Sequence, residues 1–227
     1  TVIGALAVRR GEADALICGL EGRFIKHARD ISSVIGLAET SARLSALSML
    51  IMTRGVFFLA DTYVNINPSV EEVVTITLQA RDHLKRFNIE AKAALLSYSN
   101  FGSRDGETSE KMRAVYERLK VVAPDLIVDG EMQGDVAINE QLRERYIPES
   151  VLRGEANLLI FPNLESANLS MTLLKELNNA LPVGPILMGT RQPAHILAPS
   201  VTSRGIINMA AIAASEAAGE ERQAETA

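Results

Sequence analysis

The sequence predicts an α/β fold in which a mostly parallel sheet is flanked by helices. Short continuous apolar runs alternate along the chain with longer segments whose apolar residues recur every three or four positions, the spacing of an amphipathic helix. Continuous apolar runs are typical of strands covered on both faces, and repeated strand–helix–strand units place such strands in parallel. The chain has 227 residues, of which 47% are hydrophobic, and this is enough for a substantial core.

Two strand–helix pairs are predicted in the first part of the chain. Residues 14–19 form a short apolar run, and the helical spacing of 23–36 stops at a glycine. The run VFFLAD at 56–61 predicts the next strand. The clearest helix follows at 69–89, because Ser69 can cap its first turn, glutamates follow the cap and basic residues end it.

The middle of the chain continues this alternation. A strand that ends in small polar residues is expected at 91–99, and an amphipathic helix is expected at 109–122. Residues 125–132 predict a strand followed by a turn. Since ligands bind beyond the carboxyl ends of parallel strands, the polar segments at these strand exits are the first places to look for a site.

The last part of the chain adds two strands and two helices. The apolar run at 155–164 is stopped by a proline, and Ser166 is expected to cap a helix at 166–181. The strand predicted at 184–190 lies between glycines. The final helix is expected at 206–218.

Composition excludes several classes of protein. The formal net charge of −5 and the pI near 5.4 argue against a general role on nucleic acid or on membrane surfaces. Cys18 is the single cysteine, so no intrachain disulfide can form, which fits a reducing cytoplasm. The sequence shows neither a signal peptide nor an apolar run long enough to cross a membrane.

The start of the sequence suggests a piece of a longer polypeptide. The first residue is Thr1, and the residues that follow it read as the middle of a helix. A processed or trimmed N-terminus is the alternative explanation.

No motif for a metal or a nucleotide is found in the sequence. A Walker phosphate loop does not occur, and no G-x-G-x-x-G motif follows a strand. Since His27, His83 and His195 are far apart and the cysteine is single, no metal site is expected. His83 is predicted to be solvated on the exposed face of its helix, and Cys18 is predicted to pack as a small apolar side chain.

Four segments carry groups that suit an anion, and each has a structural alternative. The strand exit SYSNFGS offers hydroxyls and free amides, although taken alone it is more often a polar turn. In MGTRQP, Gly189 allows close approach to the backbone and Arg191 supplies a fixed charge. Arg23 begins a helix whose basic face would ordinarily be solvated. In VTSRGII, Ser203 and Arg204 precede a helix, where they either hold an anion or belong to a simple capping turn.

Taken together and in order, seven segments resemble the phosphate acetyltransferase and butyryltransferase family. The segments are GEADALICG, DTYVNINPSVEEV, RFNIEAKAALLSYSNFGS, VDGEMQGDVAI, GEANLLIFPNLESANL, GPILMGT and the closing SRG…NMAAIAA. The resemblance extends through nearly the whole chain. YIPESVLRGEANLLIFPNLESANL and HILAPSVTSRGIINMAA are most similar to the transacetylase-like C-terminal domain of the bacterial multidomain NADP-dependent malic enzymes.

The resemblance implies two α/β lobes with an active-site cleft between them, assembled as a homodimer. Residues 37–192 would form one complete lobe. Residues 1–36 and 193–227 would be the remnant of a second lobe, whose N-terminal part is missing from this sequence. One side of the cleft would then be incomplete in this chain.

In the active members of the family, coenzyme A attacks the carbonyl of acetyl phosphate. The resemblance assigns Arg204 to the leaving phosphate and Ser203 to a donating or orienting role, and both would be catalytic if transfer occurs. The thiol, with an ordinary pKa of about 8.5, also needs a base. In the family this is an acidic residue on a short insertion after Ser-Arg-Gly. That insertion is absent here, and the next acidic residue, Glu216, would lie about 16 Å further along the helix.

We therefore expect a regulatory domain that binds acetyl-CoA or CoA as an effector without efficient acetyl transfer. It would act on a malic enzyme in the same polypeptide, which converts malate to pyruvate, CO₂ and NADPH and whose NADP and divalent metal would lie outside this chain. An active phosphate acetyltransferase is the alternative, and a dimerisation scaffold is a third possibility. The expected ligand contacts are Arg23, Ser97, Ser99, Asn100, Ser103, Met188, Gly189, Arg191, Ser203 and Arg204.

Overall fold

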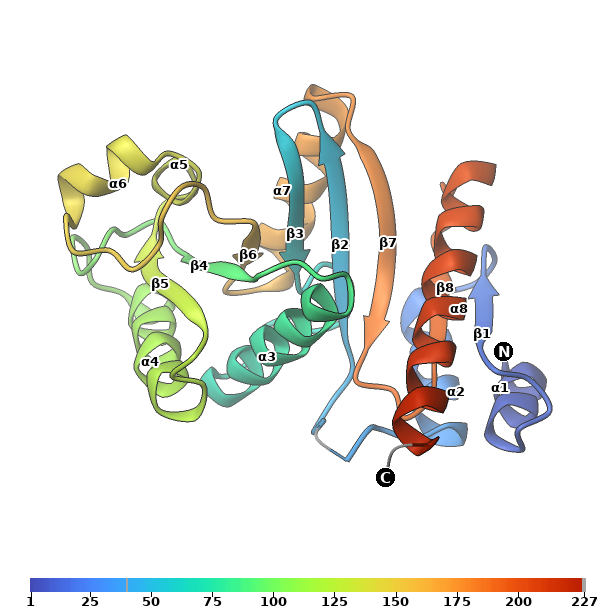
Figure 1. Ribbon diagram of the computed structural model, residues 1–227. Helices are drawn as coiled ribbons and strands as arrows, with labels where there is room; N and C mark the ends of the chain where they lie inside the picture. Colours follow the sequence, from blue (N-terminus) through green and yellow to red (C-terminus); the bar gives the residue numbers. More distant parts are fainter. Residues whose placement is uncertain (40, 226–227) are drawn as a thin grey trace.

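The computed structural model describes residues 1–39 and 41–225, and six of its strands form the main sheet (Figure 1). These strands are β2 (Ser45–Met52), β3 (Gly55–Ala60), β4 (Lys92–Leu96), β5 (Ile127–Met132), β6 (Leu158–Ile160) and β7 (Leu181–Met188). Their order in the sheet is β5–β4–β6–β3–β2–β7. The first four strands in this order pair in parallel, whereas β2 runs antiparallel to both β3 and β7. The predicted α/β fold with a mostly parallel sheet is confirmed.

A second, two-stranded sheet brings the two ends of the chain together. β1 (Leu16–Gly19) and β8 (Ala194–Leu197) pair in parallel. The helices around this sheet are α1 (Val2–Arg9), α2 (Phe24–Val34) and α8 (Ser203–Glu225) (Figure 1). α8 also packs against β7 and so connects the small sheet with the main one. The predicted second-lobe segment 193–227 includes residues 226 and 227, which lie outside the described part of the chain.

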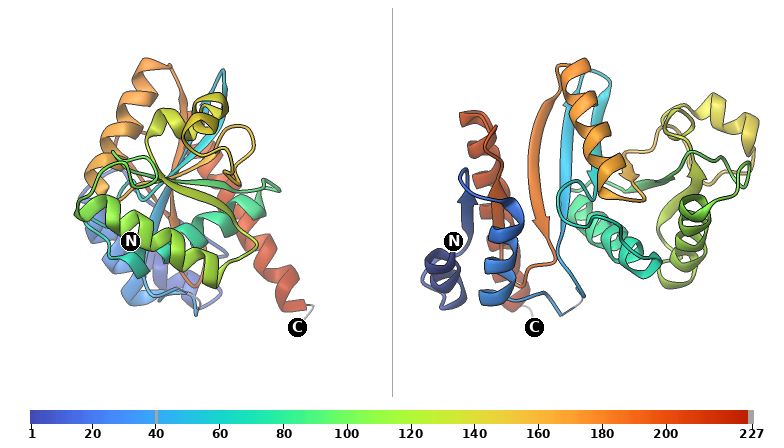
Figure 2. Two further views of the ribbon diagram at one scale, coloured as in Figure 1. Left: turned by 90° about the vertical axis from the view of Figure 1, so that its left-hand side faces the viewer. Right: turned by 180° about the vertical axis from the view of Figure 1, so that it is seen from behind.

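Helices cover both faces of the main sheet (Figure 2). One face carries α3 (Val70–Arg86) and α4 (Glu107–Val122), and the other carries α5 (Gly134–Ala137) and α7 (Leu164–Leu177). α6 (Glu140–Tyr146) follows α5. A hydrophobic core lies on each face of the sheet, and alternate residues of β3 contribute to one or the other. Phe58 packs with α3 and α4, and Leu59 packs with α7. No helix in the described part of the chain is long and apolar enough for a membrane span.

Two strands were not predicted. β2 contains serines at positions 45 and 48 within its apolar run, and it pairs with β3 through a tight hairpin in which Met52 faces Gly55. Two strands joined by a tight hairpin do not show the strand–helix alternation from which the other strands are predicted. β8 has only four residues, too few to show a period, and one of them is the buried His195.

The predicted start of α3 is confirmed, whereas that of α7 is wrong. The Ser69 side chain accepts from the Glu72 amide, and the Glu72 carboxylate accepts from the Ser69 amide at 2.7 Å, which together make a capping box. In α7 the cap is Asn163, whose Oδ1 accepts from the Ser166 amide at 2.9 Å. Ser166 therefore lies inside the first turn, three residues after Asn163, and donates its amide to the Asn163 side chain.

Candidate functional site

The first turn of α8 is capped by Thr202. Its Oγ1 accepts a hydrogen bond from the Gly205 amide at 3.1 Å, and its carbonyl oxygen accepts one from the Ile206 amide at 3.0 Å. The helix thus begins at Ser203, three residues earlier than predicted. Because Thr202 fulfils the capping role, the side chain of Ser203 is not needed for it.

Gly205 permits a close approach in this turn. A Cβ atom at this position would lie 2.7 Å from Cγ2 of Val201, closer than side-chain carbons approach one another. The absence of a side chain therefore lets the segment before the helix fold tightly against the first turn.

Ser203 and Arg204 are exposed at the amino-terminal end of α8. Neither side chain forms a hydrogen bond or an ion pair with another residue in the described ranges. Free amides and the helix dipole make this end of a helix favourable for an anion. Both side chains are therefore available to a ligand.

A pocket of about 130 Å³ lies beside this turn. Thr202 and Gly205, the neighbours of Ser203 and Arg204, form part of its wall. Lys175 of α7 adds a positive charge, although its ammonium group also pairs with the exposed Glu176 at 2.9 Å. Of the described residues that line this pocket, none is acidic. Its polar lining consists of Ser48, Tyr63, Thr172, Lys175, Ser200 and Thr202.

Tyr63 is held in the pocket wall by a buried aspartate. Oδ1 of Asp61 accepts hydrogen bonds from the amides of Ala46, Tyr63 and Val64 at 3.0–3.1 Å, and Oδ2 accepts from the Asn65 amide at 3.0 Å. Burial raises the pKa of Asp61, and these hydrogen bonds oppose that rise. Since the amides occupy both carboxylate oxygens, Asp61 orders the loop and is not free to take a proton from a ligand.

The phenol of Tyr63 is suited to donate a hydrogen bond into the pocket. Burial raises its pKa, and the charge of Lys175 opposes the rise. The hydroxyl is therefore protonated at neutral pH. Together with the lysine, the hydroxyls and the helix end, it gives this pocket the chemistry of a small anion site.

The predicted polar loop after β4 lies apart from α8. β4 is separated from β7 by three other strands of the sheet. The Ser99 hydroxyl donates to Glu131 Oε1 at 2.8 Å, and Asn100 exchanges two hydrogen bonds with Gln133. This loop holds four of the predicted contacts in an internally bonded turn: Ser97, Ser99, Asn100 and Ser103.

The other predicted contacts also lie away from the α8 turn. Met188 is fully buried, and the space beside Gly189 is filled by the carbonyl of Arg43 and the amide of Gln79. Arg191 is exposed and lies 3.8 Å from a carboxylate oxygen of Glu39. Of the predicted residues, Ser203 and Arg204 lie next to the pocket in sequence, between Thr202 and Gly205, although neither is among its lining residues.

Arg23 has an indirect link to the same pocket. It is exposed at the start of α2, and the next residue, Phe24, packs against the ring of Tyr63 with centroids 5.0 Å apart. Tyr63 follows the strand predicted at 56–61, whereas Lys175 was not predicted. A single lysine on an amphipathic helix gives no signal in a sequence.

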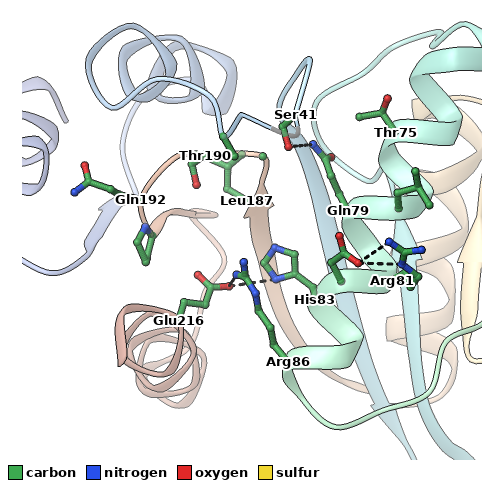
Figure 3. A pocket seen from close by; sticks show the side chains of 15 residues that line it. Ser41, Thr75, Gln79, Arg81, His83, Arg86, Leu187, Thr190, Gln192 and Glu216 are labelled. Atoms are coloured by element: carbon green, nitrogen blue, oxygen red, sulfur yellow. Dashed lines mark hydrogen bonds and ion pairs between the residues drawn. The ribbon is translucent and has the colours of Figure 1, made fainter. Parts of the chain in front are cut away.

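A second pocket, of about 300 Å³, lies further along β7, between α3, α8 and the β7–β8 connection (Figure 3). Here Glu216 of α8 accepts a hydrogen bond from His195 Nε2 at 3.0 Å and lies 3.2 Å from His83 Nδ1. The predicted solvation of His83 is wrong, because its side chain faces α8 and the residue is only 7% exposed. In the described part of the chain, no group of three or more histidine, cysteine or acidic side chains is placed to hold a metal ion.

Comparison with known proteins shows clear relatives. Residues 1–214 match the family described as phosphate acetyl/butaryl transferase. The NAD-dependent malic enzyme of Rhizobium meliloti is 56% identical over 216 residues, which cover 95% of this chain and 28% of that protein. The NADP-dependent malic enzyme of Escherichia coli is 45% identical, with 96% and 29% covered. The chain thus spans less than a third of the length of these relatives.

A solved structure agrees with this relationship. A phosphotransacetylase from Streptococcus pyogenes superposes with a TM-score of 0.91 at 28% sequence identity. The match covers 96% of this chain and 67% of that one.

Proposed function

Because this chain belongs to the phosphate acetyl/butaryl transferase family, we propose that it binds acetyl-CoA or CoA as a regulatory ligand without efficient acyl transfer. The observation that carries the proposal is the composition of the pocket at the start of α8. Its lining has a lysine, several hydroxyls and a helix end that favours anions, but among the described lining residues there is no carboxylate. Such a site can hold an acyl or phosphate group, and it lacks a general base for the thiol.

Two buried acidic residues near the site in sequence, Glu216 and Asp61, have other partners. Glu216 is the first acidic residue after Ser203, and its two oxygens face His195 and His83. Asp61 is surrounded by amide donors. Loss of a general base typically slows a reaction by about 10²- to 10⁴-fold, which would leave binding as the main property of the site.

The pocket fits one end of the ligand. Its volume of about 130 Å³ equals roughly four liquid waters, which suits an acyl or phosphate group and not a whole coenzyme A. The nucleotide end would therefore lie outside the pocket, where Arg204 supplies a fixed charge. Arg23 and Arg191 are further candidates for the phosphates of that end, because both are exposed.

We also propose that this chain is the C-terminal part of a malic enzyme in the cytoplasm. The proposal is supported by the names of its relatives and by the small fraction of their length that it matches. Those names differ in the coenzyme, NAD in one case and NADP in the other, so similarity in this region does not distinguish between the two. The coenzyme and the divalent metal would bind outside this chain, and a homodimer through this domain is proposed from the family.

Calorimetry with acetyl-CoA tests the proposed ligand. The complete protein should bind acetyl-CoA, and Arg204→Ala should weaken binding about tenfold or more, because charge-assisted hydrogen bonds to phosphate are strong. Arg145→Ala is a matched control, since Arg145 is an exposed arginine on α6. Unchanged affinity in Arg204→Ala would contradict the assignment of the site.

The family also contains active transferases, and similarity to the Streptococcus pyogenes phosphotransacetylase favours that second function. A coupled assay of acetyl-CoA formation from acetyl phosphate separates the two. Rapid turnover would replace the regulatory proposal with the catalytic one.

A further inference from the structure

The pocket of about 300 Å³ between α3 and α8 is not part of the site at the start of α8. Its volume is at the lower end of the range for small-molecule sites, so it suits a small metabolite and not a nucleotide. Its lining includes the apolar residues Ala38, Leu78, Leu187 and Pro193. His83, Arg86 and Glu216 lie together in its wall (Figure 3).

Two buried polar atoms in this wall have no hydrogen bond within the described residues. They are His83 Nδ1 and Glu216 Oε1, which lie 3.2 Å apart without hydrogen-bond geometry. Both residues are 7% exposed. Buried polar atoms in native proteins nearly always have a partner, so two adjacent exceptions in the wall of one pocket point to a ligand.

The chemistry of Glu216 specifies what the ligand must offer. The Leu187 amide donates to His195 Nδ1 at 3.2 Å, so the ring hydrogen is on Nε2 and is donated to Glu216 Oε2 at 3.0 Å. Oε2 is thereby satisfied, while Oε1 still needs a donor. An ammonium or hydroxyl group can supply that donor, because a carboxylate only accepts.

Arg86 indicates a second functional group that the ligand must carry. Its guanidinium lies 3.7 Å from Glu216 Oε1, at ion-pair distance, and its side chain is 52% exposed. The other arginine in the wall, Arg81, is already paired with Asp82 at 2.9 Å. Arg86 is therefore the arginine that can receive a carboxylate next to the donor that Glu216 requires.

We propose that this pocket is a second binding site, for a small 2-hydroxy or 2-amino acid with a short alkyl chain. The carboxylate of the ligand pairs with Arg86, its hydroxyl or ammonium group donates to Glu216 Oε1, and its alkyl chain contacts apolar residues of the lining. The site is independent of the proposed acyl-CoA site, because the two pockets share no lining residue.

Amide hydrogen exchange on the complete protein tests this proposal with three probes of equal carbon length. (S)-2-hydroxybutyrate, (S)-2-aminobutyrate and butyrate differ only in the donor at carbon 2. At least one of the two donor-bearing acids should protect peptides covering residues 75–86 and 187–193, and the stronger of them identifies the class of the ligand. The protection of these peptides by butyrate, measured as the decrease in their exchange rate, should be at least tenfold weaker. Absence of protection by both donor-bearing acids, or equal protection by butyrate, would overturn the proposal.

Variants confirm which residues bind the probe. Arg86→Ala should weaken binding of the protecting acid about tenfold or more, since it removes a charge-assisted hydrogen bond. Arg118→Ala on α4 is the control, because Arg118 is a partly exposed arginine that does not line the pocket. Affinity for acetyl-CoA should be unchanged in Arg86→Ala, so this result is separate from the fate of the acyl-CoA proposal. Equal affinity of Arg86→Ala and wild type for the acid would contradict the assignment.

Discussion

Replacement of Glu216 by glutamine should lower the stability of the fold in a pH-dependent way. Burial opposes ionisation of this carboxyl, but the hydrogen bond with His195 and the nearby ring of His83 outweigh burial and lower its pKa from 4.5 to about 2. A carboxyl whose pKa is lower in the folded protein stabilises that protein above its unfolded pKa. The stabilisation is present above pH 4.5 and is lost as the pH falls toward 2.

The size of the effect follows from the two pKa values. A difference between 4.5 and about 2 corresponds to about 3 kcal/mol of unfolding free energy. Glu216→Gln keeps the shape of the side chain and removes its charge, so up to about 3 kcal/mol should be lost at pH 7. The lost free energy corresponds to contacts between elements, because Glu216 of α8 contacts His195 of β8 and His83 of α3.

Urea unfolding of the wild type and the variant measures this difference. The difference in unfolding free energy should be largest at pH 7 and should shrink as the pH is lowered from 4.5 toward 2. Glu110→Gln is the control, because Glu110 is an exposed glutamate on α4. A loss below about 1 kcal/mol at pH 7, or a difference that does not change with pH, would show that the Glu216 carboxylate does not stabilise the fold in this way.

Four further substitutions have expected outcomes. Arg143→Met should cost about 3 kcal/mol in urea unfolding, because four backbone carbonyls lose the buried guanidinium that donates to them; a loss below 1 kcal/mol would contradict this. Asn163→Ala should lower the melting temperature more than Ser166→Ala, since Asn163 is the cap of α7, at a cost of about 1 kcal/mol. If Ser166→Ala lowered the melting temperature more than Asn163→Ala, the cap predicted from the sequence would be correct. Gly205→Ala should destabilise the first turn of α8 by about 1–3 kcal/mol and weaken acetyl-CoA binding in calorimetry, whereas unchanged affinity would show that this turn does not shape the site.

Local signals in the sequence predicted much of the fold. Continuous apolar runs revealed β3 to β7, and the capping box at Ser69 fixed the start of α3 because all of its determinants lie within four residues. The family resemblance drawn from seven segments is confirmed by the match over residues 1–214. The hairpin strand β2 and the four-residue strand β8 were missed, since one depends on a partner strand and the other is too short to show a period.

The candidate site was predicted only in part, because it depends on contacts that are distant in sequence. Ser203 and Arg204 were found from their place before an apolar helix, and the structure leaves both exposed there. Lys175 lines the neighbouring pocket from another helix, which no local pattern indicates. The burial of His83 was missed for the same reason: its helical face looks polar in sequence, and its partner Glu216 is more than a hundred residues away.

The site at the start of α8 is proposed to bind an acylated coenzyme without the base required for turnover. The most direct measurement is the rate of acetyl-CoA formation from saturating acetyl phosphate and CoA, on a preparation shown by calorimetry to bind acetyl-CoA. We predict a turnover number at least 100-fold below the value of about 10 s⁻¹ that is common among enzymes. A turnover number of about 10 s⁻¹ or more would contradict the claim and identify the domain as an active transferase.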